Sequence, residues 1–352
     1  MIHLKRSMIA GLEGPSPDLQ SVLDALQSAI KLEHATIPLY LYALYSLDRG
    51  KNPEIAAILE SVVVEEMLHM TLSSNVLNAL GGSPAINDPD FIPTYPGALP
   101  GGVESQLTVH LAPFSMSDPV DQLGTFLTIE APEHPLVLSA VEDETVTIGK
   151  FYDKLSAAIA ALGDGAFLNP SPNQVGRDLM RESVVVTDVA TAQLAIRTIV
   201  DQGEGTSTSP VEVFGTGYAH YYRFMQIRKG HLLMPVEGGG PAPEDKYAYT
   251  GDPVPFDPAG VYAVPVDPGG YPSGSAAAFF NDSFNYTYTS LLNALHQLFN
   301  GDNSQDRMNE AIGLMMSLKG QAKGMMSGIP DPAQLVGPSF EYQPVAPGPG
   351  PA

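Results

Sequence analysis

The amino-acid sequence predicts a mainly α-helical protein organised as a four-helix bundle around a metal site. Two long segments of helical periodicity lie near the N-terminus, with only a short connection between them. Glu33 falls on the apolar stripe of the first segment, and Glu66 and His69 fall on that of the second. A Glu on one helix and a Glu-x-x-His pair on the next form half of the ligand set of carboxylate-bridged metal sites in four-helix proteins.

The first predicted helix spans about residues 17–48 and ends near Arg49 and Gly50. Pro38 is expected to kink it just beyond Glu33, because a proline removes one backbone hydrogen bond and clashes with the preceding turn. The apolar stripe of this helix consists of Val22, Leu26, Ile30, Ile37, Leu41 and Leu44.

The second predicted helix has Asn52 as its expected N-cap and Pro53 as its first residue, and it is expected to stop at Gly81 and Gly82. Glu65 is expected to point away from the apolar stripe. That stripe consists of Ile55, Leu59, Val62, Met70, Val76 and Leu80.

Glu33 and Glu66 are expected at similar depth in this helix pair. The short connection makes the helices antiparallel neighbours, and each glutamate lies about 16 residues from the turn. A buried carboxylate is costly unless it is paired or binds a metal, so two of them beside His69 predict a shared cation. The alternative is that both glutamates are exposed, or that His69 is a hydrogen-bonded core residue.

The chain contains 34 glycines and 32 prolines, and they are concentrated in segments that cannot propagate a helix. We therefore expect a single domain over residues 1–343, with insertions at about 82–117 and 231–274, followed by a flexible tail at 344–352. A short strand is expected within SQLTVHLAPF, at 105–114, and irregular structure is expected throughout the second insertion.

Six further helices are predicted from the remaining periodic segments, at about 118–131, 147–162, 188–204, 216–231, 275–299 and 305–327. Glu130 ends the first of these and is interpreted as a group that supports a metal ligand rather than as a ligand. Glu133 and His134 have ligand chemistry, but they lie beside prolines in an expected loop.

Glu204 and His220 lie near the ends of two successive predicted helices. Glu204 stands between two glycines, so its backbone is free to leave the helix and direct the carboxylate inward. His220 shares an apolar face with Phe224, which directs its ring to the same interior. These two residues can supply the other half of the metal shell, although a solvated helix end and a hydrogen-bonded core imidazole remain open alternatives.

The composition excludes several classes of function. A net charge of -22 argues against nucleic acid or an anionic membrane as a partner. The absence of cysteine excludes disulfides, iron–sulfur clusters and thiolate catalysis, so any metal must be held by histidine and carboxylate. No signal peptide is apparent, and no stretch approaches the ~20 apolar residues of a membrane span. A cytoplasmic protein is therefore expected.

Several motifs occur in a fixed order along the chain: LEHATIPLYLYAL, EEMLHM, FLTIEAPE, TIGKFY, IVDQGEGT, HYYRF, LLNALHQLFNG and GPSFEY. As an ordered set over about residues 17–343, they resemble the ferritin-like domain of the iminophenyl-pyruvate dimer synthase family. The resemblance implies a ferritin-like four-helix bundle with extra C-terminal helices. It also implies a metal shell formed by Glu33, Glu66, His69, Glu204 and His220. Large members of that family couple two aromatic amino-acid-derived imines oxidatively in violacein and indolocarbazole pathways.

Lys150 departs from the pattern of that family, which usually reads TIGEFY. Thr147 is the expected N-cap of its helix, and residue 150 is the third helical residue on the outward face. The missing glutamate would close a capping box rather than bind metal. Its loss therefore costs cap stability, about 1 kcal/mol or less, and leaves the metal-site prediction unchanged.

The expected function is that of a metal-dependent oxidoreductase acting on an aromatic amino-acid-derived imine or a related small molecule in secondary metabolism. One or two iron ions are the expected cofactor, and manganese or zinc also suit such ligands. The alternatives are an iron-binding or storage protein without a committed substrate, and a structural protein with a vestigial metal site. Besides the small-molecule substrate, the expected partners are a second copy of the chain or a pathway enzyme.

Overall fold

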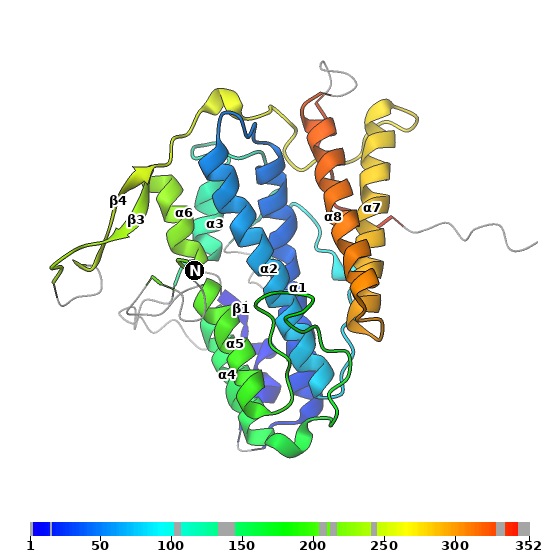
Figure 1. Cartoon of the computed structure of the whole chain (residues 1–352). Helices are drawn as coiled ribbons and strands as arrows, with labels where there is room; N and C mark the ends of the chain where they lie inside the picture. The colour runs from blue at the N-terminus through cyan, green and yellow to red at the C-terminus, as the bar shows by residue number, and fades with distance from the viewer. Residues whose placement is uncertain are drawn as a thin grey trace, which may run out of the picture.

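The computed structural model describes residues 3–14, 16–101, 107–132, 145–203, 210–211, 217–240, 245–328 and 335–343. Helices form most of its regular structure, with two short strand pairs beside them (Figure 1). The predicted mainly α-helical fold is confirmed.

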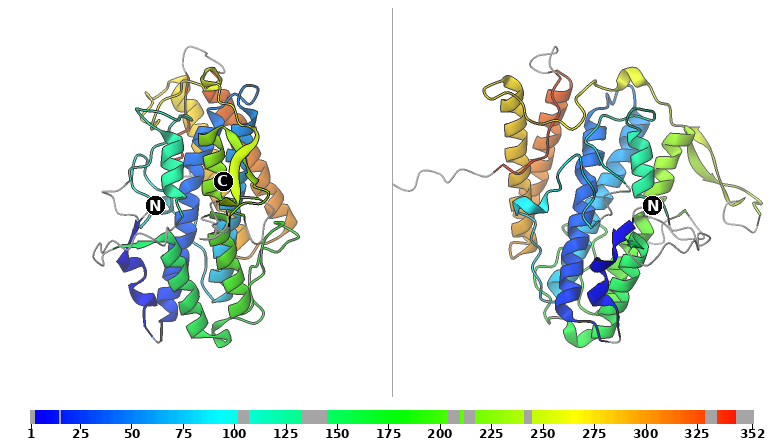
Figure 2. Two further views of the ribbon diagram at one scale, coloured as in Figure 1. Left: turned by 90° about the vertical axis from the view of Figure 1, so that its left-hand side faces the viewer. Right: turned by 180° about the vertical axis from the view of Figure 1, so that it is seen from behind.

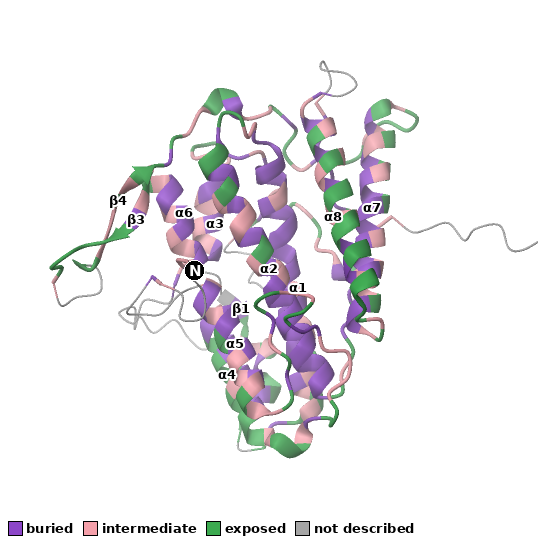
Figure 3. Ribbon diagram, in the orientation of Figure 1, coloured by how far each residue is buried: buried purple, intermediate pink, exposed green. Residues whose placement is uncertain are grey.

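Two long antiparallel helices, α1 (Leu19–Tyr45) and α2 (Pro53–Ala79), form the centre of the molecule. The side chain of Asp18 caps α1 by accepting a hydrogen bond from Ser21 N at 3.2 Å. Helix α1 continues through Pro38 to Tyr45. Most residues of both helices are buried (Figure 3), so the two predicted stripes belong to helices covered on more than one side.

The turn between α1 and α2 is tied to a distant loop. Asn52 stands at the N-cap position of α2, as predicted, but its side chain does not cap the helix. Its Nδ2 instead donates to the backbone carbonyls of Asp257 and Gly260 at 3.0 and 3.2 Å. The long connection that follows the bundle is thereby fastened to the end of α2.

Four shorter helices cover one side of the α1–α2 pair. These helices are α3 (Gln122–Ile129), α4 (Ile148–Leu162), α5 (Val189–Gly203) and α6 (His220–Lys229). In Figures 1 and 2, α4 and α5 lie side by side along one half of the long helices, and α3 and α6 lie along the other half. The third and fourth positions of the bundle are thus each occupied by two short helices, which meet near the middle of α1 and α2.

A helical hairpin lies on the other side of the α1–α2 pair. It consists of α7 (Ala276–Phe299) and α8 (Gln305–Met326). Lys319 Nζ on α8 contacts Glu60 Oε1 on α2 at 2.7 Å. These are the extra C-terminal helices that the sequence predicts.

Two antiparallel strand pairs were not predicted. β1 (His3–Lys5) pairs with β2 (Thr145–Thr147), and β3 (His231–Pro235) pairs with β4 (Tyr247–Pro253). The expectation that residues 231–274 are irregular is therefore wrong at its start, where a hairpin projects from the bundle (Figure 1). Buried and exposed side chains do not alternate in this hairpin, because neither face is consistently buried.

The strand expected at 105–114 is not formed in its described part, residues 107–114. Only Val109 makes a bridge, to Gly97. The alternating apolar residues Val109 and Leu111 are buried against the bundle, and the backbone runs across it without a partner strand. Packing of single side chains therefore produced the period-two pattern.

The start of α4 agrees with the prediction. The Thr147 hydroxyl accepts a hydrogen bond from Lys150 N at 3.2 Å, and the Lys150 side chain is exposed. Phe151, Tyr152 and Leu155 are buried on the opposite face. Among the described residues, no helix combines the length and the apolar character that a bilayer crossing requires.

Candidate metal centre

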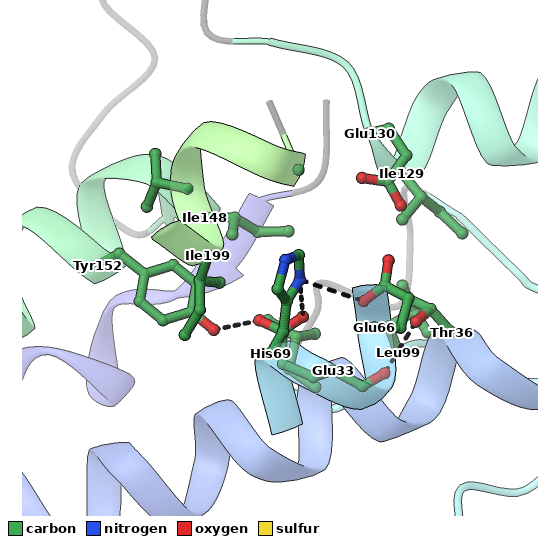
Figure 4. A pocket seen from close by; sticks show the side chains of 13 residues that line it. Glu33, Thr36, Glu66, His69, Leu99, Ile129, Glu130, Ile148, Tyr152 and Ile199 are labelled. Atoms are coloured by element: carbon green, nitrogen blue, oxygen red, sulfur yellow. Dashed lines mark hydrogen bonds and ion pairs between the residues drawn. The ribbon is translucent and has the colours of Figure 1, made fainter. Parts of the chain in front are cut away.

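The first group of ligand-type side chains joins α1 to α2. Glu33 on α1 and Glu66 and His69 on α2 are all buried. His69 Nδ1 lies 3.4 Å from Glu33 Oε2 and 3.7 Å from Glu66 Oε2, and Figure 4 shows the three side chains converging. The alternative in which both glutamates are exposed is wrong.

A second group joins α2 to α3 and α6. His220 Nδ1 lies 3.2 Å from Glu66 Oε1 and 3.5 Å from Glu130 Oε2. Glu130 is the C-cap residue of α3, and His220 is the first residue of α6. Both side chains therefore come from helix ends, near the middle of the bundle where the short helices meet.

Glu66 belongs to both groups, with one oxygen near each histidine. Within each group, the potential ligand atoms lie within 4.8 Å of one another. The rings of His69 and His220 are nearly parallel, with centroids 5.4 Å apart. A carboxylate between two such groups has the geometry of a bridging ligand in a two-metal site, in which the ions stand about 3.5–4 Å apart.

The outer nitrogens of both imidazoles have partners that orient the rings. His69 Nε2 lies 3.0 Å from Gln202 Oε1, and the amide of Gln202 in turn donates to Glu182 at 3.1 Å. His220 Nε2 lies 3.0 Å from Glu65 Oε2. Because each Nε2 faces an acceptor and can donate to it, each Nδ1 is the nitrogen that would bind a metal once its own proton is displaced.

Two buried phenols hold two of the carboxylates. The Tyr152 hydroxyl donates to Glu33 Oε1, and the Tyr40 hydroxyl donates to Glu130 Oε1. In both cases the other carboxylate oxygen, Oε2, is the one that faces a histidine. The phenols therefore restrict the rotation of the carboxylates and leave one oxygen of each directed into the centre.

The protonation of this centre follows from burial and close charges. Burial raises the pKa of Glu33 and of Glu130 above their ordinary values. Burial also opposes ionisation of Glu66, but the imidazoles of His220 and His69 outweigh it and hold the pKa of Glu66 well below its usual range. Burial lowers the pKa of His69, but hydrogen bonding to Glu33 and Glu66 outweighs it and raises that pKa to about 10. Burial also lowers the pKa of His220, but the surrounding carboxylates of Glu130, Glu65 and Glu66 outweigh it and raise that pKa well above its ordinary value. Without a metal the imidazoles therefore keep protons, and metal binding must displace them.

One buried atom shows that these residues fit a metal ion. His220 Nδ1 is shielded from solvent and makes no hydrogen bond with any described residue, although two carboxylate oxygens stand near it. Two buried carboxylates this close to one nitrogen are costly unless a positive charge stands among them. A cation held between Nδ1, Glu66 and Glu130 would take the place of the imidazole proton and neutralise the carboxylates. Oxygen and imidazole donors of this kind suit a divalent first-row metal.

A cavity of about 50 Å³ adjoins the first group. Figure 4 shows the side chains that line it. Glu33, Glu66, His69 and Glu130 form its polar wall. Its remaining lining is largely aliphatic and includes Leu32, Leu99, Ile129, Ile148, Ile199 and Val200. The first group thus borders a small space whose other walls are mostly apolar.

Comparison with known proteins identifies the family and the fold. A family model described as ferritin-like matches residues 26–229, which include every residue of the centre. This chain belongs to the ferritin-like family. A crystal structure at 1.95 Å of a ferritin-like protein from Caulobacter vibrioides is similar, with a TM-score of 0.64 and 24% sequence identity over 94% of this chain and 100% of that chain. A search of curated proteins found no match.

The ferritin-like bundle brings together four of the five predicted ligands: Glu33, Glu66, His69 and His220. Glu204 lies outside the described residues. Gly203, directly before it, lines the cavity, and a Cβ at Gly203 would lie 3.9 Å from Glu130 Oε2. Helix α5 therefore ends beside the centre. That these five residues bind metal stays a prediction.

Glu130 has a more direct place in the centre than the sequence indicated. Its place at the end of a periodic segment predicted only a supporting role, whereas its carboxylate stands among the ligand atoms. Its position at a buried helix end is the signal that could have identified it. Glu65, which was expected to point away from the apolar stripe, is partly buried, and its carboxylate contacts His220 Nε2 at 3.0 Å. Glu133 and His134 lie outside the described residues.

Proposed function

We propose that this protein is a ferritin-like oxidoreductase with two non-haem iron ions, acting on an aromatic amino-acid-derived imine or a related small molecule. The observation that carries the proposal is the pair of ligand groups that share Glu66, with His220 Nδ1 left without a hydrogen bond. Both groups are buried and oriented, and buried carboxylates are costly without a bound cation, which argues against a vestigial site.

The proposed nuclearity follows from the donor set. Each group offers two carboxylates and one imidazole, and the complete set holds three carboxylates. Di-iron bundle proteins use single Glu residues on two helices and Glu-x-x-His pairs on the other two. Glu33 and Glu130 correspond to the single residues, and Glu66 with His69 corresponds to one pair. Glu204 and His220 would be the second pair, divided between two helices.

Iron is the proposed metal because carboxylate and imidazole ligands without thiolate suit a redox-active hard ion, and manganese and zinc are the competing occupants. When bound, iron would supply electron transfer and reactivity toward dioxygen. The protein's own contribution is orientation. Tyr152 and Tyr40 restrain two carboxylates, Gln202 orients His69, and Glu65 orients His220.

The proposed reaction joins two imines through a new C–C bond. This coupling removes two electrons and two protons in total, and dioxygen is the proposed acceptor, which gives hydrogen peroxide. The aliphatic cavity of about 50 Å³ holds a diatomic molecule or the reacting end of a substrate, but not a whole coupled product. Its apolar wall excludes bulk water from the reacting atoms. The resemblance to the iminophenyl-pyruvate dimer synthase family supports this choice of substrate.

The test combines metal analysis with oxygen uptake. The protein is loaded with Fe(II) without oxygen, freed of excess iron and analysed for iron per chain. Oxygen consumption is then followed with and without an imine generated from phenylalanine or tryptophan. We expect two irons per chain, substrate-dependent oxygen uptake and a coupled product detected by mass spectrometry.

The matched control is Glu60→Gln, which replaces a partly exposed carboxylate on α2 that is bound by Lys319 and Arg49. This variant is expected to keep full activity, whereas Glu66→Gln is expected to lose it. Oxygen uptake that depends on Fe(II) alone, with many irons accumulating per chain, would identify a storage protein instead. Absence of bound iron at stoichiometric loading would contradict both functions.

A further inference from the structure

A second cavity lies where the α7–α8 hairpin packs against α1 and α2. Its unfilled volume is about 70 Å³. Its lining contains no Asp, Glu, Lys or Arg among the described residues and is dominated by flexible aliphatic side chains, including Met67, Met70, Met315, Leu291, Leu292 and Leu295. Such a lining excludes a charged ligand, because burying an unpaired charge is costly.

One polar pair interrupts this apolar wall. The Tyr288 hydroxyl on α7 lies 2.7 Å from His34 Nε2 on α1, and both residues line the cavity. His34 Nδ1 is buried and makes no hydrogen bond with any described residue. In a neutral imidazole one nitrogen donates and the other accepts, so His34 keeps one unused hydrogen-bonding position whichever role Nε2 takes toward Tyr288. An unused buried position of this kind is destabilising unless a partner arrives.

The C-terminal segment 335–343 contributes an aromatic wall that is held firmly in place. Phe340 lines the cavity and packs against Tyr288 with ring centroids 5.3 Å apart. Its φ of 52° lies in the left-handed region, which is unfavourable for a bulky residue. Two asparagines of α7 maintain it, because Asn281 accepts from Ser339 N at 2.9 Å and Asn285 accepts from Glu341 N at 3.1 Å.

We propose that this cavity binds a small compound of the phenol class, with one aromatic ring and one hydroxyl group that pairs with His34 Nδ1. The aromatic rings of Tyr288 and Phe340 favour an aromatic ligand through edge-to-face contacts. The methionine thioethers favour it through sulfur–ring contacts. An engineered apolar cavity of about 150 Å³ binds benzene. The present cavity is about half that volume, so the flexible methionine side chains that line it must change rotamer to admit a single ring.

The proposal is independent of the metal centre, because none of these contacts involves a ligand-type carboxylate of that site. Its test uses a fluorescent reporter. The chain contains no tryptophan, so Phe340→Trp places the only indole at the cavity wall. Phe279→Trp is the matched control, because Phe279 on α7 is 67% exposed and does not line the cavity.

Phenol is titrated into both reporter proteins, with and without iron. We expect a saturable change of emission from residue 340, the same in both metal states, and no saturable change from residue 279. Adding Leu295→Phe to the Phe340→Trp protein fills the cavity and should abolish the response. Adding His34→Leu should weaken phenol about tenfold, the equivalent of one hydrogen bond. Toluene lacks the hydroxyl, so it should bind the protein that carries His34→Leu at least as tightly as it binds the protein with Phe340→Trp alone.

Equal responses at residues 340 and 279, or a response that persists with Leu295→Phe, would overturn the proposal. Circular dichroism establishes that each variant is folded. A crystal of the unmodified protein soaked in 4-bromophenol decides the question without any substitution. Anomalous bromine density between α1 and α7, with the hydroxyl toward His34, is the expected result. Density elsewhere, or none at saturating concentration, would refute the site.

Discussion

At the scale of single residues, the centre depends most on Glu66, because its two oxygens stand near different histidines. Glu33 and Glu130 each face only one of the two groups, and phenols restrain both of them. Loss of Glu66 should therefore affect both ions, whereas loss of Glu33 should affect one.

Glu66→Ala is expected to leave less than one metal ion per chain, and Glu33→Ala is expected to leave about one. His69→Ala should resemble Glu33→Ala, because His69 is a potential ligand only in the first group. Removal of one ligand from a buried shell leaves an incomplete site around a charge. Elemental analysis after gel filtration measures the occupancy.

Glu60→Gln on the same helix is the control for this series and should retain full occupancy. Equal metal content in Glu66→Ala and in the unmodified protein would show that neither group binds an ion. Equal losses in all three ligand variants would show that the groups do not act as two sites.

A pH dependence follows from the raised pKa of His69. In the metal-free protein this pKa is about 10, against an ordinary value of 6.5, so the native state holds an extra proton between these values. The stabilisation from that proton is complete below pH 6.5 and is lost as the pH rises through 10. The free energy of unfolding should therefore fall with rising pH in this window, by up to about 1.4 kcal/mol per pH unit for each such proton.

Urea denaturation with a chelator, at several pH values from 6.5 to 10, measures this slope. His69→Gln should flatten it, because glutamine does not titrate, and the raised pKa of His220 should preserve the rest. The same slope in both proteins would show that the pKa of His69 is not raised by the carboxylates.

At the scale of elements, the third and fourth positions of the bundle are each occupied by two short helices, and the ends of these helices place two of the potential ligands. Glu130 ends α3 and His220 begins α6, so both lie at interruptions rather than within continuous helices. α4 contributes Tyr152, which donates to Glu33 from the other half of the bundle. The position of that phenol depends on how well α4 is formed.

Thr147→Ala removes the N-cap of α4 and should lower the free energy of unfolding by about 1 kcal/mol. Ser304→Ala removes the equivalent cap of α8, which accepts from Arg307 N at 3.2 Å, and should cost a similar amount. Only the first change is expected to weaken metal binding, because α4 carries Tyr152, whereas α8 carries no residue of the centre. Urea denaturation and competition with a metal chelator separate the two effects. If both variants bind metal equally well, the placement of Tyr152 does not depend on this cap.

At the scale of the whole molecule, the centre connects parts of the chain that local structure does not hold together. Its potential ligands come from α1, α2, α3 and α6, and the hydrogen bond between His220 and Glu65 spans 155 residues of sequence. A metal at this position would cross-link the two long helices to the two short ones. The α7–α8 hairpin contributes no potential ligand and would not be cross-linked by the metal.

Metal removal is expected to destabilise the protein measurably. A ligand at one thousand times its dissociation constant stabilises the native state by about 4 kcal/mol. For a chain of this size, that corresponds to a fall in Tm of about 5 °C on chelation. Differential scanning calorimetry of loaded and chelated protein measures the shift. Glu66→Ala should show no difference between the two conditions, and an unchanged Tm in the unmodified protein would contradict a structural contribution from the metal.

The sequence by itself determined the helices and much of the centre. Periodicity placed α1 and α2 within a few residues, and it identified Glu33, Glu66 and His69 as inward-facing, because helical spacing is a local property of the chain. Glu204 was assigned from its neighbouring glycines and stays a prediction.

Only the tertiary structure decided the second ligand group and the second cavity. The carboxylate of Glu130 meets His220 because two helix ends converge on α2, and no local pattern records that convergence. Likewise, His34 and Tyr288 are 254 residues apart in the sequence. Neither helical pattern indicates that the two side chains meet, and only the packing of the helices brings them together. The physical reason is the same in both cases: burial depends on which distant element covers a side chain, whereas periodicity reports only the side of its own helix on which it lies.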